Sequence, residues 1–492
     1  MGGWYGISIG LLLWQYLTTL RRGSSHSAQE WYRTALCGIG IASLGLPLLS
    51  HDLYSYMIYG RLWSAYHLNP YTVLPSAIGG DPLFSWISAR WQQTPCVYGP
   101  VALYLTSLVS AITGDHLLLY VAGMKVLAGL SAIGTVWILQ RMIQATVDPA
   151  DRTMATLLTC ANPLLLIEIA YQGHNDGLMV LAIAAGVWAY NHQREWFGAL
   201  CFTLGIFTKF FAIVPFGLYL LYHLGHSPGW RAKFGHLLRA LVTVVGMAWL
   251  LYVPLWDGIG TFRIPAAATA PHYTTLTRSL VEIIYWIADQ GGTHPDRVTL
   301  LYLGIVWGII AYCTVRALRR IRQGRELWIV AGGVLISYYL FAAGWFQVWY
   351  LPWALPLLVG NIRSPWITIF LLMMAGGLSH YALYLIAPSP LQEGMAFGMT
   401  HLPALWLCIT WMRKKPHRWG PTGSRPRHPG RRFRRSTTPS GLTSGAPRPS
   451  RTAALKGRLH HTLHSLRLCF ATQHSWALTR LCRWRGRREP LQ

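Results

Sequence analysis

An acidic side chain stands among aromatic residues in the stretch 51–61, directly after an apolar segment. If residues 53–66 form a helix, its aromatic side chains recur at helical spacing, which suits a helix lying at a membrane interface. These aromatic residues are Tyr56, Tyr59, Trp63 and Tyr66. Asp52 would stand at the first turn, either as an N-cap for free backbone N–H groups or as a group that takes part in chemistry. The sequence leaves both roles open.

A second polar cluster, His174-Asn175-Asp176, follows an apolar run that contains Glu168. Gly and Asn make this segment a good turn, but a plain turn rarely needs His, Asn and Asp together. An acid inside a predicted membrane span is a candidate for function by default. Glu168 lies about one turn from the end of its run, so snorkelling or pairing with Lys209 is the alternative.

Lys209 is a lone cation between two apolar half-spans. It could bind a phosphate group as a compact ammonium, or cap the C-terminus of the preceding helix. Aromatic residues cluster at 345–353 and include Trp349 and Tyr350. Such rings form membrane aromatic belts, and they also pack against sugar faces and isoprenoid chains. No Gly-rich phosphate loop or nucleophile elbow is found, so chemistry with a cytosolic nucleotide is disfavoured.

The composition indicates which elements must position these residues. The chain has 492 residues, of which 53% are hydrophobic and 12% charged, with a mean hydropathy of +0.32. Soluble domains carry roughly 25% charged residues. We therefore predict an all-α, polytopic transmembrane bundle of about 11–13 spans. The apolar runs lie at about 4–20, 34–50, 117–139, 154–170, 177–190, 196–208, 210–223, 238–255, 299–315, 327–343, 350–360, 366–386 and 395–412.

Basic clusters fall in alternate loops, and these loops are predicted to be cytoplasmic. If the run 101–113 crossed the membrane completely, the basic clusters in all later loops would lie outside. We therefore expect this run to dip into the outer leaflet and return. The first external loop then covers residues 51–116, and the polar residues singled out above face the outside. The predicted location is the cell membrane, with the active site on the external face.

The net charge of +26 comes mostly from the C-terminal residues. Residues 413–492 hold nearly half of the 42 Lys and Arg residues and are rich in Pro, Ser and Gly. A polybasic segment after a last membrane helix more often meets anionic lipid than nucleic acid, so we expect membrane lipids as a partner and no nucleic acid. We predict a transmembrane domain at 1–412 and a disordered cytoplasmic tail at 413–492. The eight cysteines are scattered and indicate neither disulfides nor a zinc site.

Several short motifs follow one another along residues 33–360. They are His51-Asp52, the run 56–61, Asn69-Pro70-Tyr71, Tyr98-Gly99-Pro100, Asn162-Pro163, the run 173–176, Lys209 and the run 349–353. In this order the chain resembles the GT-C glycosyltransferases, and most nearly the bacterial polyprenyl-phosphate-mannose-dependent mannosyltransferases. The resemblance implies membrane-dipping helices in the first external loop, a polyprenyl-phosphate-sugar donor, and a glycan or lipid-linked acceptor.

The resemblance also suggests residue roles. Asp52 matches the family's acid in the first external loop, and we expect it to act as the general base that takes the acceptor's proton. The leaving phosphate needs cations or a divalent metal, a possible cofactor here. Candidates for contact with substrate are Arg61, Tyr59, Tyr98, His174, Asn175, Asp176, Lys209, Trp349 and Tyr350. Of these, Lys209, Arg61 and His174 are expected at the phosphate, and Asp176 or Asn175 at the sugar or metal.

Two other functions compete with this hypothesis. A lipid-linked-sugar transporter or flippase would use Glu168 and Lys209 to line a pathway, but it needs polar groups near the membrane midplane. A scaffold that anchors partners through the basic tail would leave the external clusters without a role. The external clustering favours the enzyme.

Overall fold

The computed structural model describes residues 2–262, 295–319, 321, 325–343, 346–383 and 389–413. The regular elements of these residues are helices, with one isolated β-bridge between Asp257 and Ile259. The predicted all-α class is confirmed. Trp345, residues 263–294 and the basic tail from residue 414 on lie outside the described residues, so the division at residues 412 and 413 stays a prediction.

The longer helices follow the predicted apolar runs closely. They are α1 (Gly2–Arg22), α2 (Ala28–Leu44), α3 (Asp52–Ser64), α5 (Pro100–Thr113), α6 (Leu117–Thr146), α7 (Arg152–Thr159), α8 (Asp176–Asn191), α9 (Glu195–Ile206), α10 (Ile213–His226), α11 (Gly229–Tyr252), α14 (Pro295–Leu318), α15 (Arg325–Phe341), α17 (Pro365–Leu383) and α18 (Ser389–Arg413). One compact unit, Met1–Ala404, contains all of them except the end of α18.

Among the described residues, three helices are long and apolar enough to cross a membrane. They are Leu117–Thr146, Gly229–Leu255 and Leu300–Leu318. The predicted span at 350–360 is wrong, because this run forms the 3-10 helix η8 (Val348–Ala354) and the four-residue α16 (Leu355–Leu358). Pro352 and Pro356 lack the N–H groups that a continuous helix would use, which explains the short elements.

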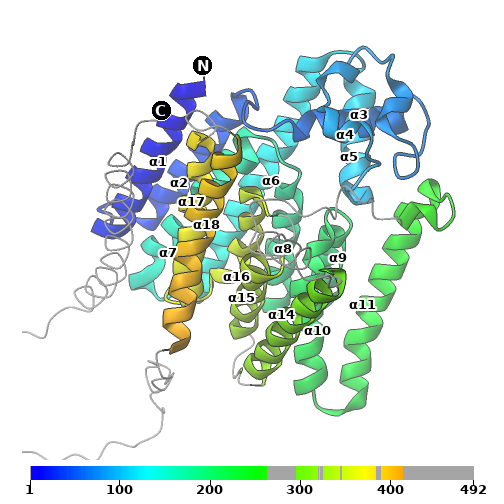
Figure 1. Ribbon diagram of the computed structural model, residues 1–492. Helices are drawn as coiled ribbons and strands as arrows, with labels where there is room; N and C mark the ends of the chain where they lie inside the picture. Colours follow the sequence, from blue (N-terminus) through cyan, green and yellow to red (C-terminus); the bar gives the residue numbers. More distant parts are fainter. Residues whose placement is uncertain are drawn as a thin grey trace, which may run out of the picture. The chain divides into compact units, whose positions relative to one another are not determined.

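The predicted helix at 53–66 is confirmed as α3, which lies with α4 (Ala89–Gln92) and α5 at one end of the bundle (Figure 1). The helix α3 packs against α5 and against the short 3-10 helices η1 (Pro75–Ile78) and η2 (Phe84–Trp86). The predicted interfacial aromatic stripe is wrong for Tyr56 and Tyr59, which are each only 1% exposed, whereas Tyr66 is 40% exposed. Helical spacing identified one face of α3, but protein covers Tyr56 and Tyr59 on that face.

The helix α5 has 14 residues and is about 21 Å long, which is shorter than the ~30 Å hydrocarbon core. It approaches α3 closely at Gly60, where an added Cβ would lie 2.8 Å from the Thr106 carbonyl oxygen. The Thr106 hydroxyl also donates to the Tyr56 carbonyl at 3.0 Å. A length that cannot cross the membrane suits the predicted dip of this run.

The predicted span at 154–170 is interrupted. The helix α7 ends at Thr159, and Asn162-Pro163 lie in the break that follows. Residues Leu165–Tyr171 then form η4, a π-helix. Pi-helical segments are rare, and they occur frequently at functional sites. The interruption places Glu168 and the turn that follows it beside α2 and α6.

Lys125, a buried residue of α6, fixes the end of this π-helix. Its ammonium donates to the carbonyl oxygens of Ala42 at 3.1 Å and Ala170 at 2.5 Å, and to that of Tyr171. One ammonium therefore joins the C-terminal end of α2 to the C-terminal end of η4. This contact fixes the start of the polar turn.

Candidate active site

An ion pair between Lys209 and Asp176 forms the centre of the candidate site. Asp176 is the first residue of α8, and Lys209 lies in the turn between α9 and the 3-10 helix η5 (Phe210–Ala212). The Lys209 ammonium donates to Asp176 Oδ2 at 2.6 Å, and Trp353 Nε1 donates to Asp176 Oδ1 at 2.8 Å. The Asp176 side chain is completely buried, whereas that of Lys209 is 13% exposed. The cation is therefore held by a buried acid and keeps some access to solvent.

Aromatic rings surround the same ammonium. Lys209 Nζ lies 5.4, 5.6 and 5.9 Å from the ring centroids of Tyr98, Tyr350 and Trp353. Ring faces attract a cation at such distances. The predicted substrate residues Tyr98, Asp176, Lys209 and Tyr350 are thus brought together from four separate segments of the chain.

A close backbone contact positions Tyr98 beside the Lys209 ammonium. The Gly99 N–H donates to the Thr208 carbonyl at 3.0 Å, and the Val101 N–H donates to the Phe207 carbonyl at 2.9 Å. A Cβ at residue 99 would lie 2.1 Å from the Phe207 carbonyl oxygen, so only glycine permits the contact. The loop before α5 is therefore docked on the turn that carries Lys209.

Asp52 is the first residue of α3 and is only partly exposed. The predicted N-cap alternative is wrong, because His51 occupies the N-cap position and no side chain caps this helix end. Burial raises the pKa of Asp52 to about 6, Lys209 and Arg90 act against this rise, and Asp176 adds to it. Its carboxylate accepts no hydrogen bond from the described residues. The carboxylate is thus free to bind a proton, and the charges of Lys209 and Asp176 influence its pKa.

His174 and Asn175 lie directly before Asp176 in a buried turn that begins at Gly173, where φ is +76°. The His174 ring packs on Trp349 with a centroid distance of 4.4 Å. Burial and the charges of Lys209 and Lys125 hold the pKa of His174 well below its ordinary value. His174 is therefore neutral and offers hydrogen bonds rather than charge, and its expected contact with the phosphate stays a prediction.

Glu168 does not pair with Lys209, so that alternative is wrong. Its Oε2 accepts a hydrogen bond from the Tyr381 hydroxyl at 3.0 Å and lies 3.6 Å from His174 Nδ1. Lys209 pairs with Asp176 instead, and Asp176 is also the acid whose charge acts on Asp52.

Two of the expected substrate residues are engaged elsewhere. The Arg61 guanidinium donates to Asp81 at 2.6 Å, to the Gly114 carbonyl at 2.7 Å and to Asp115 at 2.6 Å. The buried Tyr59 hydroxyl donates to the Thr94 carbonyl at 2.9 Å. Both side chains hold the folded loop together, and the structure does not bring Arg61 to the ammonium cluster.

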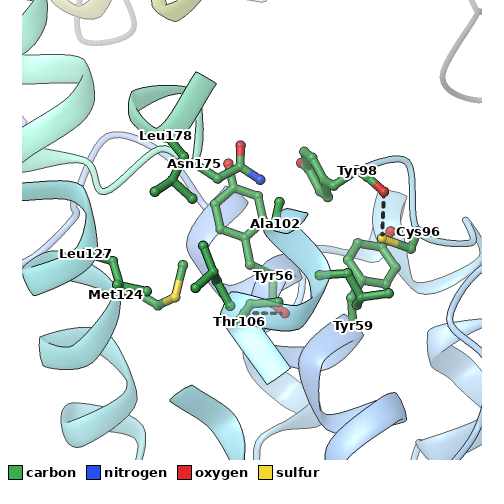
Figure 2. A pocket seen from close by; sticks show the side chains of 12 residues that line it. Tyr56, Tyr59, Cys96, Tyr98, Ala102, Thr106, Met124, Leu127, Asn175 and Leu178 are labelled. Carbon is green, nitrogen blue, oxygen red and sulfur yellow. Dashed lines mark hydrogen bonds between the residues drawn. The ribbon is translucent and has the colours of Figure 1, made fainter. Parts of the chain in front are cut away.

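A small pocket of about 10 Å³ lies next to the site and has room for about one water molecule. Figure 2 shows Asn175, Tyr56 and Tyr98 around it, with Met124 and Leu127 of α6 on one side. The Tyr56 and Tyr98 rings meet edge to face at 4.8 Å. The pocket thus lies between residues of α3, α5 and α6 and the start of α8.

Sequence reasoning missed two residues near the site. Arg90 in α4 is exposed, and its charge acts on Asp52 and Tyr350. An arginine in an aromatic stretch of the predicted external loop was the available signal. Trp353, which donates to Asp176, lay inside the aromatic run, but no pattern in the sequence separates it from its neighbours.

The residues present do not fit a divalent metal. Both Asp176 oxygens accept hydrogen bonds from protein groups, one from Lys209 and one from Trp353. Within the described ranges, no three His, Cys, Asp or Glu side chains gather as metal ligands. No step below is therefore routed through a metal.

Comparison with known proteins gives consistent matches. A family model described as "Alpha-(1->6)-mannopyranosyltransferase, N-terminal domain" matches residues 1–224. The chain is 28% identical over 386 residues to the Alpha-(1->6)-mannopyranosyltransferase A of Mycobacterium tuberculosis, covering 72% of this chain and 70% of that protein. It is 24% identical over 376 residues to the protein of the same name from Corynebacterium glutamicum, covering 69% and 74% respectively. The resemblance predicted from the sequence is confirmed, and the matches support a mannosyltransferase.

Proposed function

We propose that this protein transfers mannose from a polyprenyl-phosphate donor to a hydroxyl group of a glycan or lipid-linked acceptor on the external face of the membrane. The sugar follows from the names of the relatives, which are mannopyranosyltransferases. The donor class and the external side follow from the sequence motifs and the loop charges. One observation carries the proposal. The Asp52 carboxylate accepts no hydrogen bond from the described residues, and the charges of the Lys209–Asp176 ion pair act on it.

The proposed reaction is a single displacement. The acceptor oxygen forms a bond to the anomeric carbon of the sugar while the bond between that carbon and the phosphate oxygen breaks. Polyprenyl phosphate leaves with the electron pair, and Asp52 takes the acceptor's proton. A β-linked donor would then give the α product named in the relatives, and their names suggest a 6-hydroxyl as the acceptor.

The charges around Asp52 suit this division of roles. A base with a pKa of about 6 is ionised at neutral pH, yet it binds a proton more readily than an ordinary aspartate does. Lys209 uses one of its three N–H donors on Asp176, so the others remain for the leaving phosphate. Arg90 is a second candidate cation, on an exposed helix turn. Preorganised cations stabilise the charge that develops as the phosphate departs.

Aromatic and amide groups are proposed to bind the sugar and the lipid. Tyr98, Tyr350 and Trp349 present rings beside the ion pair or beside His174, and Asn175 is buried next to Asp176. Arg61 and Tyr59 are expected to stabilise the fold, since their polar groups are already engaged.

The positions of the charged groups argue against a transporter. Asp52 and Asp176 are the first residues of α3 and α8, and Lys209 lies in a turn between helices. A transport pathway needs polar groups within the bundle that are reached from both sides. The predicted external location of these three groups, away from the membrane midplane, favours a reaction site.

Transfer by purified protein tests the proposal. Wild type should move radiolabelled mannose from polyprenyl-phosphate-mannose, but not from GDP-mannose, to a membrane acceptor fraction. Asp52→Asn should reduce this transfer by about 10²- to 10⁴-fold, the usual contribution of a general base. Asp257→Asn, the same change at an exposed residue, should leave the rate unchanged. Transfer from GDP-mannose alone would refute the donor, and full activity of Asp52→Asn would refute the base.

A further inference from the structure

Glu168 has no role in the mechanism above, although it is buried in the middle of the π-helix η4. Its side chain is completely buried, as is that of His174. Burying polar groups is costly unless they are hydrogen-bonded. The contacts of this carboxylate therefore call for an explanation.

The first contacts concern one oxygen of Glu168. Oε2 accepts a hydrogen bond from the Tyr381 hydroxyl at 3.0 Å. The same oxygen faces Nδ1 of His174 at 3.6 Å, slightly beyond hydrogen-bond length. Because Oε2 acts as an acceptor for Tyr381, it is also suited to accept from an Nδ1–H. This oxygen therefore favours the imidazole tautomer that carries its proton on Nδ1.

The second observation concerns the other ring nitrogen. Within the described part of the chain, neither nitrogen of His174 has a hydrogen-bond partner, and the same holds for Oδ1 of the adjacent Asn175. Buried polar atoms in native proteins almost always have partners. Two neighbouring acceptors without partners match the adjacent hydroxyl groups of a sugar ring. They lie one and two residues before Asp176, which holds Lys209.

The third observation is the fixed plane of the imidazole. Its ring packs on Trp349 at a centroid distance of 4.4 Å and an interplanar angle of 41°. Its neutral state leaves one nitrogen with a lone pair, as a hydroxyl donor requires. A buried ring that packs on Trp349 and faces the Glu168 carboxylate with Nδ1 has little freedom to turn.

We propose that Glu168 is a positioning residue, which holds the His174 imidazole with its proton on Nδ1 so that Nε2 accepts a hydrogen bond from a hydroxyl group of the transferred sugar. The identity of the ligand rests on the proposed function, whereas the orientation of the ring rests on the contacts above. This role resembles the carboxylate–histidine pairs that fix tautomers in metal and catalytic sites.

A set of variants tests the coupling between the two side chains. Glu168→Leu removes the acceptor, and kcat/KM for the donor should fall by roughly 5- to 150-fold, as for a lost buried hydrogen bond. Glu168→Gln keeps an acceptor oxygen and should stay within about threefold of wild type. His174→Phe keeps the ring on Trp349 but removes both nitrogens, so the double variant with Glu168→Leu should be no worse than His174→Phe alone. Losses that multiply, or equal losses in Glu168→Leu and Glu168→Gln, would overturn the proposal.

A spectroscopic measurement separates this inference from the proposed function. In protein with ¹⁵N-labelled histidine, the His174 signals are those that disappear in His174→Phe. Wild type should show the proton on Nδ1, and Glu168→Leu should shift the population toward Nε2–H. An unchanged tautomer would refute the positioning role even if transfer is intact. If wild type transfers no mannose, the proposed function fails, and the tautomer comparison still decides the role of Glu168.

Discussion

Two cations near the α3–α5 end of the molecule differ in how completely the protein satisfies them. Arg61 donates to Asp81, Asp115 and a backbone carbonyl, so each of its guanidinium nitrogens has a partner. Lys209 donates one hydrogen bond to the described residues, to Asp176, and aromatic rings surround the rest of its ammonium. Both cations are paired with acids, but only Lys209 keeps donors for a ligand.

The acids differ in the same way. Asp81 accepts from Arg61, from the Tyr66 hydroxyl and from the Leu83 N–H. Asp52 accepts from none of the described residues, and its pKa is raised to about 6. The comparison teaches that an ion pair alone does not mark a site. We propose that an ion pair beside an acid without hydrogen-bond partners among the described residues, as at Asp52, marks one.

The largest expected effect is on transfer by Lys209→Met. Without the ammonium, the leaving phosphate loses a preorganised cation and Asp176 is left as a buried charge, so kcat should fall by about 10²- to 10³-fold. Initial rates with polyprenyl-phosphate-mannose measure this fall. Lys233→Met, in the second turn of α11, should transfer at the wild-type rate. A Lys209→Met enzyme with normal kcat would remove the distinction between the two cations.

Arg61→Met should instead affect stability. Removing one partner of a buried ion pair costs about 3 kcal/mol, because Asp81 keeps its charge without its cation. Thermal unfolding in detergent should show a lower Tm, whereas the donor KM of the protein that remains folded should be unchanged. A raised donor KM with an unchanged Tm would instead support the predicted contact between Arg61 and the phosphate.

A smaller effect is expected for Arg90→Gln. Arg90 is exposed, so its attraction for a phosphate is screened by solvent and salt. We expect a rise of about fivefold in donor KM at low salt that shrinks as ionic strength increases. Arg141→Gln is the matched control, because Arg141 also lies over a tryptophan ring, at 5.5 Å. A salt-independent effect would indicate that Arg90 makes a buried contact.

The sequence was sufficient for the parts of the fold and site that depend on local pattern. Apolar runs predicted most helices, and charged residues in apolar surroundings identified Asp52, Asp176 and Lys209. The contacts that define each role join distant residues, such as Trp353 with Asp176. Arg61 was assigned to the phosphate because nothing in the spacing relates it to Asp81 and Asp115.

The burial of α3 escaped prediction for a related reason. Helical spacing of aromatic residues shows that they share a face, but it does not show whether lipid or protein covers that face. Residues 69–98 fold back over it, with the Tyr59 hydroxyl bound to the Thr94 carbonyl and the Tyr71 hydroxyl to that of Tyr98. The π-helix that places Glu168 depends on tertiary contacts in the same way, including those of Lys125.

The pH dependence of transfer tests the central claim most directly, because Asp52 must be ionised to accept a proton. With a pKa of about 6, wild-type kcat/KM should be constant above neutrality and should fall about tenfold per pH unit well below pH 6. The residual rate of Asp52→Asn should lack this fall, while Asp257→Asn should keep it. The same acid limb in Asp52→Asn would contradict the account, because another group would then be the base.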